Sequence, residues 1–447
     1  MEVRDYQTKA IEDIDKNWMT HRRVLLVSPT GSGKTVIASR IARLIKDVGR
    51  RCVFLVHKRE LFAQTVATLI KSGLHNDIGV VSADDTRDTW QPFIVASIPT
   101  LVRRPRLKLP ADIVVIDEAH HAAARTWANT VDERWPKAHI LGMTATPRRT
   151  DSRALGQHFD VIVQTPQIAQ MIKGGYLCDF DVLKPPYALK TKGVKVAGSD
   201  FDHTSMKKAL EKTRGKTIIE VLKSWSKHAR DMKTIIFAVD IAHSKKIAEA
   251  FRAAGYTCAH IDADTDSDLR DKTLRLFRAG QIQVITNVRL LSEGLDVPDC
   301  QCVVMARPTA SIIDYFQQAG RMMRPKRDGK KGLLLDLAGN FYIHGLTPKD
   351  VVKWSLDGEP NPDHEKGEAK AISYHTCENC IRPYNSMRLK CPHCGHERER
   401  SGQLVEEIEA SLVKHRGKEA NASFQEMVED IYRGNITMQS IIDDIMR

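Results

Sequence analysis

The chain has 447 residues, of which 42% are hydrophobic and 28% are charged, a balance typical of soluble globular proteins and not of disordered or fibrous ones. The 68 lysines and arginines exceed the 56 aspartates and glutamates by a formal charge of +12, which favours a polyanionic partner such as nucleic acid. No apolar run is long enough to cross a bilayer and the first residues lack the apolar core of a signal peptide, so we expect a cytoplasmic protein.

The first third of the chain alternates apolar strand candidates with polar or helical stretches. Strands are expected at residues 24–27, 52–56, 93–97, 113–117 and 140–144. This rhythm predicts an α/β fold with a parallel sheet covered by helices on both faces. We take residues 1–165 as the first domain.

A glycine-rich segment, Ser-Pro-Thr-Gly-Ser-Gly-Lys-Thr at residues 28–35, follows the first of these strands. Its glycines let backbone N–H groups face phosphate oxygens, its lysine reaches the β- and γ-phosphates, and its last hydroxyl ligates Mg²⁺. A helix from about Thr35 to Lys46 would point its positive end at the anion. The candidate phosphate-binding residues are Thr30, Gly31, Ser32, Gly33, Lys34 and Thr35. The alternative is an ordinary glycine turn that opens a helix.

An acidic pair ends the fourth expected strand, at the edge where open parallel sheets bind ligands. Asp117 is the candidate to hold Mg²⁺, directly or through water. Glu118 is the candidate to orient and deprotonate the attacking water. The alternative is a surface acidic pair in a loop. Together with the glycine-rich segment, the pair predicts hydrolysis of a nucleoside triphosphate.

The second half repeats this alternation after a change in character. Residues 166–215 contain paired glycines, paired prolines and several lysines, and we expect an irregular connector there. Residues 216–345 have strand candidates at 234–238, 257–261, 284–286, 302–305 and 332–335, and a helix candidate at 244–253. They predict a second domain of the same architecture, with the nucleotide bound in the cleft between the two domains.

Two arginines stand three residues apart in the second domain, so a helix would carry Arg321 and Arg324 on one face. A guanidinium suits a phosphate whose charge grows in the transition state, and such a group contributes on the order of 10³–10⁵ in rate. We expect Arg324 to be this arginine finger and Arg321 to contact the γ-phosphate. The alternative is a basic surface helix.

These segments, in this order, resemble the helicases of superfamily 2, in the DEAH-box style of Asp-Glu-Ala-His at residues 117–120. The resemblance covers roughly residues 1–345 and is closest to RadD-like DNA helicases of bacteria and phages, which implies a bacterial or phage-infected cell and a role in DNA repair or replication. It implies two tandem RecA-like domains that bind ATP and Mg²⁺ between them.

The resemblance also implies roles for single residues. Gln7 would read adenine, Gly294 and Asp296 would lie beside the nucleotide, and Gln317 would join the catalytic set. The residues expected to couple hydrolysis to movement are His120, Thr144 and Thr146. The residues expected to contact nucleic acid are His57, Lys58, Arg59, Ser97, Thr100 and Thr286.

Residues 346–375 are polar and read as a linker, and a cysteine cluster follows at residues 376–397. Two Cys-x-x-Cys pairs can close a tetrahedral site for Zn²⁺ and so fold a short ribbon. The ligands would be Cys377, Cys380, Cys391 and Cys394, with disulfides or free thiols as the alternative. The five other cysteines are expected to be reduced core residues. Residues 398–447 are expected to form a helical tail.

The sequence therefore predicts an ATP-dependent DNA helicase or translocase that moves on a strand and unwinds duplexes or remodels branches. An RNA helicase, or a DNA-stimulated ATPase or adaptor without strand separation, stays open. The motor subunit of a restriction system is a further alternative, although no nuclease motif is evident. We expect a monomer whose partner is single-stranded or branched DNA, and a protein partner could bind the ribbon or the tail.

Overall fold

The computed structural model describes most of the first 356 residues and two short strands beyond them. The described residues are 3–57, 59–121, 125–147, 155–184, 196–197, 200–202, 214–292, 300–326, 329–344, 346–352, 354–356, 374–376 and 383–385. Lys58, Gly294, Asp296, the four cysteines of the expected zinc site and the expected tail lie outside these ranges. Among the described residues, none of the helices has the length and apolar character needed to span a membrane.

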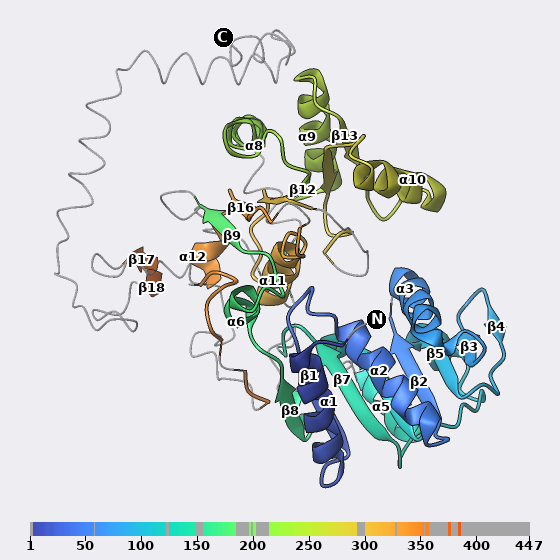
Figure 1. The fold of residues 1–447 in the computed structure, drawn as a ribbon. Helices are drawn as coiled ribbons and strands as arrows, with labels where there is room; N and C mark the ends of the chain where they lie inside the picture. Colours follow the sequence, from blue (N-terminus) through green and yellow to red (C-terminus); the bar gives the residue numbers. More distant parts are fainter. Residues whose placement is uncertain are drawn as a thin grey trace, which may run out of the picture.

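The first lobe is built on an eight-stranded sheet (Figure 1) in the order β4-β3-β5-β2-β6-β7-β1-β8. All its strand pairs are parallel except β3 with β4. The strands are β1 (Arg23–Val27), β2 (Cys52–Val56), β3 (Ile78–Val81), β4 (Thr86–Arg87), β5 (Phe93–Ser97), β6 (Ile113–Asp117), β7 (His139–Thr144) and β8 (Val161–Gln164). The helices are α1 (Asp5–Trp18), α2 (Lys34–Asp47), α3 (Arg59–Leu69), α4 (Ile98–Arg103) and α5 (Arg125–Arg134), with short turns at Ile70–Leu74, Ala119–His121 and Leu155–Gln157. Helix α6 (Ile168–Lys173) follows β8 and packs on the core of the second lobe.

The second lobe has a six-stranded parallel sheet in the order β13-β14-β12-β15-β16-β9. Its strands are β9 (Phe180–Leu183), β12 (Thr234–Phe237), β13 (Cys258–His260), β14 (Val284–Asn287), β15 (Cys302–Met305) and β16 (Gly332–Asp336). Its helices are α8 (Arg214–His228), α9 (Ile241–Ala253), α10 (Ser267–Arg278), α11 (Ile312–Gly320) and α12 (Asn340–His344). Two antiparallel pairs complete the described elements: β10 (Val196–Ala197) with β11 (Asp200–Phe201), and β17 (Tyr374–Thr376) with β18 (Pro383–Asn385).

Each sheet is buried on both faces, which explains the unbroken apolar runs in its central strands. Along β1, Val24 and Leu26 join the core under α1 and α2, whereas Leu25 and Val27 join the core under α4 and α5. In β12, Phe237 packs with α10 and α11 while its neighbour Ile236 packs with α8 and α9. Because successive side chains of a strand point to opposite faces of the sheet, each of these strands contributes to two hydrophobic cores.

The expected pair of parallel-sheet domains is confirmed, and every strand expected from the sequence lies within two residues of an observed one. Among the described strands, the sequence did not predict β3, β4, β8 and β9, nor the two short antiparallel pairs. Part of the expected connector, β9, pairs with β16 and so extends the second sheet. This pairing joins segments about 150 residues apart, which local periodicity does not reveal.

After α12 the chain returns to the first lobe; we call residues 346–352 and 354–356 the return segment. Leu346 and Val352 pack on the core of the second lobe, whereas Trp354 and Leu356 pack on that of the first. The Gln167 side chain donates to the Val352 carbonyl and accepts from the Val352 amide, at 2.8 and 2.9 Å. The return segment is thus a second covalent and packed connection between the lobes.

Candidate nucleotide site and the facing helix

The glycine-rich segment curls between the end of β1 and the start of α2, as the phosphate site requires. Gly31 and Gly33 both have φ of +84°, a left-handed backbone that only glycine adopts without strain. Gly33 also lies close to Gln7, because a Cβ there would meet the Gln7 Nε2 at 2.7 Å. Both glycines are therefore needed for their left-handed conformation, and Gly33 is also needed because a side chain there would collide with Gln7.

Side chains from the first and last segments of the first lobe's sequence form hydrogen bonds with this phosphate loop. The Ser28 and Ser32 hydroxyls lie 2.6 Å apart, and Thr165, just after β8, donates to Ser28 Oγ at 2.8 Å. Tyr6 donates its hydroxyl to the Ser32 carbonyl at 2.5 Å. Sequence reasoning missed Tyr6 and Thr165, and it treated Ser28 only as a departure from the usual glycine. The hydroxyl of Ser28 is in fact the link between the loop and the edge strand.

Gln7, a residue of α1, packs against the same loop and is shielded from solvent. Its side chain is 3% exposed, its Nε2 donates to the Ser32 carbonyl at 3.1 Å, and its Oε1 accepts from the Arg4 amide at 3.0 Å. The structure thus places Gln7 beside the nucleotide site, with its amide engaged by the protein. Lys34 Nζ donates to the Ser28 carbonyl at 3.3 Å, so the lysine folds back over the same loop.

The acidic pair lies at the carboxyl end of β6, next to the phosphate loop. Thr35 and Asp117 line one small pocket, which brings the two expected Mg²⁺ ligands together. Glu118 has a φ of +49°, an uncommon conformation for a residue with a side chain and one that functional sites often contain. Its amide donates to Asp117 Oδ1 at 3.0 Å, which helps to hold this turn. A hydroxyl and a carboxylate oxygen are donors that suit Mg²⁺.

A buried chain of polar groups runs from the acidic pair to the end of β7. Glu118 Oε2 lies 3.4 Å from His120 Nδ1, which is also 3.1 Å from the Thr144 hydroxyl. Thr144 Oγ1 donates to the Thr146 carbonyl at 2.9 Å and accepts from the Thr146 amide at 3.1 Å. The structure therefore brings together all three residues expected to couple hydrolysis to movement.

The end of α11 packs directly on the phosphate loop of the other lobe. A Cβ at Gly320 would lie 2.5 Å from Thr30 Cβ, so the Gly320 backbone lies against the Thr30 side chain with no room for a methyl group. Arg324 Cγ lies 3.9 Å from the position of a Cβ on Gly31. Leu177, from the segment before β9, closes the other side of Gly31 at 3.3 Å. The lobes thus meet at the residues expected to hold phosphate.

The side chains of Arg321 and Arg324 contact different parts of the molecule. Arg321 Nη2 donates to the Ser292 carbonyl of its own lobe at 2.5 Å, and the side chain is buried. Arg324 lies along the phosphate loop, where burial, and secondarily the charge of Arg278, lowers the pKa of its guanidinium. Gln317 is 2% exposed, and its amide forms no hydrogen bond with the described residues. Of the expected catalytic arginines, Arg324 is therefore the one adjacent to the loop.

The expected nucleic-acid contacts fall into two groups. His57 packs near Trp127 with tilted rings whose centroids lie 6.0 Å apart. Arg59 is exposed and pairs with Asp84 at 3.4 Å, and Ser97 ends β5 at the same sheet edge. Thr100 is buried in α4. The Thr286 hydroxyl is also buried, and it donates to the Ser244 carbonyl at 3.0 Å. In this conformation the two threonines serve the fold and do not face solvent.

Family comparisons agree with this geometry. Residues 1–149 match the model of the "Type III restriction enzyme, res subunit", and residues 214–326 match the "Helicase conserved C-terminal domain". The chain is thus a helicase-type protein with one matched domain in each lobe. The first match contains the phosphate loop and the acidic pair, and the second contains α11 and both arginines, so each helicase domain supplies one side of the site.

Several known proteins are similar to the helicase over most of its length. A 51.5 kDa protein of a Lactococcus phage is 29% identical over 395 residues, which is 87% of this chain and 82% of the phage protein. The DNA 3'-5' translocase XPB2 of Sulfurisphaera tokodaii is 24% identical over 75% of this chain and 81% of the translocase. The IRC3 relative from Saccharomyces cerevisiae is 29% identical over 83% of this chain, but the chain spans only 56% of that protein.

Among solved structures, the ATP-dependent Type ISP restriction-modification enzyme LlaBIII bound to DNA has a TM-score of 0.56 at 17% identity, over 76% of this chain and 28% of that structure. This likeness confirms the fold of two RecA-like lobes.

Proposed function

We propose that the helicase hydrolyses ATP between its two lobes and uses the cycle to move along a DNA strand. The observation that carries the proposal is the contact between Thr30 of the phosphate loop and Gly320 at the end of α11. A phosphate bound on the loop would lie beside both lobes, so its cleavage would change the contact between them. Movement driven by alternating closure and opening follows from that geometry.

Each part of the proposed site has a role that its chemistry supports. Lys34 and the loop amides would bind the β- and γ-phosphates, and Thr35 and Asp117 would hold Mg²⁺, which would offset the phosphate charge. Glu118 would orient the attacking water, since its Oε2 accepts no hydrogen bond from the described residues and is held only by the His120 ring. Arg324 would stabilise the transition-state charge from the opposite lobe.

DNA is the proposed strand because the relative from Sulfurisphaera is named a DNA translocase and the restriction enzyme with the same fold was solved on DNA. The formal charge of +12 favours either nucleic acid equally. We further propose a likeness to RadD-like helicases and preference for single-stranded or branched DNA. The protein would act as a monomer, in the cytoplasm of a bacterial or phage-infected cell.

The test is the ATPase rate of the full chain with single-stranded DNA, forked DNA and RNA in parallel, at two salt concentrations. We expect DNA to stimulate hydrolysis about tenfold or more, with stimulation that weakens as salt displaces phosphate contacts. A strand-displacement assay on the fork would then separate unwinding from translocation alone. Stimulation by RNA only would identify an RNA helicase, and no hydrolysis with any strand would refute the motor.

We also propose a structural zinc ribbon at Cys377, Cys380, Cys391 and Cys394. The support is the donor set and its position, because the first pair lies in sequence between β17 and β18, two strands that pair antiparallel. Elemental analysis of the purified chain should find about one zinc per molecule. Replacing Cys377 and Cys380 by serine should remove it, whereas Cys178→Ser should not.

A further inference from the structure

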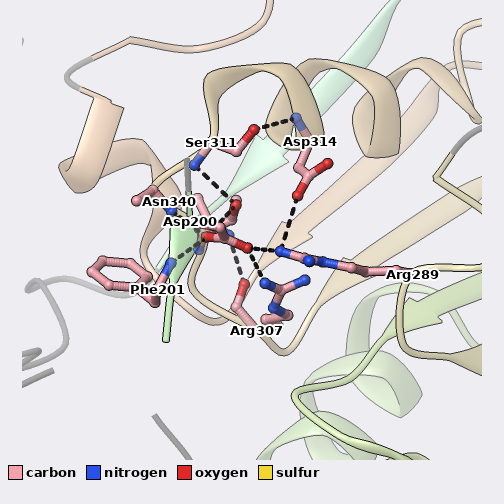
Figure 2. Close-up of polar contacts among 9 residues, drawn as sticks. Asp200, Phe201, Arg289, Arg307, Ser311, Asp314 and Asn340 are labelled. Atoms are coloured by element: carbon pink, nitrogen blue, oxygen red, sulfur yellow. Dashed lines mark hydrogen bonds and ion pairs between the residues drawn. The ribbon is translucent and has the colours of Figure 1, made fainter. Parts of the chain in front are cut away.

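A buried carboxylate from the connector lies in the second lobe and binds two arginines (Figure 2). Asp200, on β11, is 4% exposed, and its Oδ2 accepts from the guanidinium groups of Arg289 and Arg307. Its Oδ1 accepts from the Thr309 hydroxyl at 3.0 Å and from the Ala310 amide at 2.8 Å. Both oxygens of this carboxylate are therefore engaged by residues far away in the sequence.

The partners of Asp200 belong to two different strands of the second sheet. Arg289 follows β14, and Arg307 follows β15. In the sheet order, β12 lies between these strands, and the chain changes direction across the sheet between β12 and β15. The carboxyl edge at such a switch point is where open α/β sheets bind ligands. In this lobe an internal carboxylate neutralises the arginines at that edge.

The same carboxylate fixes the start of α11. Thr309 and Ala310, which it binds, immediately precede the N-cap Ser311, whose amide donates to the Thr309 hydroxyl at 3.1 Å. Arg289 also lies 3.5 Å from Asp314 in the first turn of α11 (Figure 2). The helix is therefore held at its N-terminus by Asp200 and meets the phosphate loop at its C-terminus.

The charges make this contact costly to remove. Burial favours the neutral form of Asp200, but the charges of Arg307 and Arg289 and the backbone hydrogen bonds outweigh it, so the pKa of the carboxyl lies below its ordinary value. Arg307 is 2% exposed and would be left without this buried counter-ion. Asp200 thus stays ionised and in place while the second lobe is folded.

Given the proposed function, we infer that Asp200 is a positioning residue. It couples the segment after β14, which directly follows the expected nucleic-acid residue Thr286, to the arginine-bearing end of α11. A shift of the segment after β14 moves Arg289, and Arg289 reaches α11 both through Asp200 and through Asp314. The resulting displacement of α11 then changes the distance between Arg324 and the phosphate loop. DNA binding would in this way accelerate ATP hydrolysis.

The test compares Asp200→Asn and Arg289→Met with wild type and with Asp179→Asn. The first variant keeps the shape of the side chain, and the second alters a half-exposed residue. Asp179 is a matched control because it also binds two cations, Lys331 and Lys349 at 3.0 and 2.5 Å, but none of its interactions with the described residues involves α11. Thermal unfolding of every variant shows which ones fold.

We expect Asp200→Asn and Arg289→Met to lower the ratio of DNA-stimulated to unstimulated ATPase about tenfold, while the Kd for single-stranded DNA and the KM for ATP change less than about threefold. Asp179→Asn should keep the wild-type ratio. An equal loss of stimulated and unstimulated rates would show that Asp200 only stabilises the lobe and would overturn the inference, as would an unchanged ratio in folded variants. If wild type itself shows no ATPase, the proposed function fails instead.

Discussion

At the scale of single residues, Glu118 combines an uncommon backbone with a carboxylate held close to His120. A left-handed conformation at a residue with a side chain costs on the order of 1 kcal/mol, which the surrounding contacts must offset. The turn directs the side chain toward the Thr144–Thr146 chain and not along the strand. The conformation therefore places the proposed base between the proposed metal ligands and the residues expected to respond to hydrolysis.

Glu118→Gln should leave ATP binding intact and slow hydrolysis by about 10²–10⁴, because an amide of the same shape does not accept the proton of water. Single-turnover hydrolysis and equilibrium binding of a fluorescent ATP analogue measure the two steps separately. Glu133→Gln, on the exposed side of α5, is the control and should match wild type. A wild-type rate in Glu118→Gln would assign the base to another residue.

At the scale of elements, the sequence was most informative where chemistry follows a buried strand directly. The phosphate loop after β1, the acidic pair ending β6 and the arginines after α11 were all located from spacing alone. What the sequence could not show are contacts between distant segments, such as Thr165 with Ser28 and Asp200 with Arg307. Such pairs carry no local periodicity, because they are set by which strands become neighbours.

The start of α12 illustrates a polar group that only the folded lobe defines. Asp336 is fully buried at the end of β16, where it accepts from the Asn340 and Phe341 amides at 2.9 and 2.7 Å. Burial raises the pKa of this carboxyl to about 6, although these hydrogen bonds oppose the rise. Asn340 in turn accepts from the Thr309 amide at 2.8 Å, which links the α12 turn to the segment that Asp200 holds.

Because the folded-state pKa of Asp336 lies above the unfolded value of about 3.8, its contribution to stability is greatest at low pH and is lost as pH rises through about 6. The free energy of unfolding of wild type, relative to Asp336→Asn, should fall by about 2 kcal/mol between about pH 4 and pH 7. Urea denaturation of both proteins across this range measures the difference, in which the other carboxylates cancel. A difference independent of pH would mean that Asp336 titrates normally.

At the scale of the whole molecule, three connections join the lobes within the part of the chain that the structure describes: the connector, the return segment and the contact of α11 with the phosphate loop. The first two join the chain on the side of β8 and α6, where Gln167 binds Val352 and Tyr6 packs against Tyr176 with ring centroids 4.8 Å apart. The third has no covalent link and consists of close packing at Gly320. Opening of the cleft would therefore separate the third connection first.

Gly320→Ala tests that arrangement, because the added methyl would lie 2.5 and 2.6 Å from Thr30 Cβ and Cγ2 only while the lobes are closed. The φ of Gly320 is not in the left-handed region, so alanine should not destabilise the folded lobe and should favour the helix by about 0.5–1 kcal/mol. Hydrolysis should nevertheless fall by about 10²-fold, since Arg324 would be held roughly 1 Å too far from the loop.

The control for Gly320→Ala is a glycine whose replacement should lower stability without changing hydrolysis. Gly280 has a φ of +78° and lies away from the junction after α10, with its nearest neighbour, Lys233 Cε, 3.7 Å from an added Cβ. Gly280→Ala should therefore lower the unfolding temperature through backbone strain while leaving single-turnover hydrolysis unchanged. If Gly320→Ala hydrolyses ATP at the wild-type rate, the close approach of α11 is not part of the reactive state, and closure must bring the lobes together through other residues.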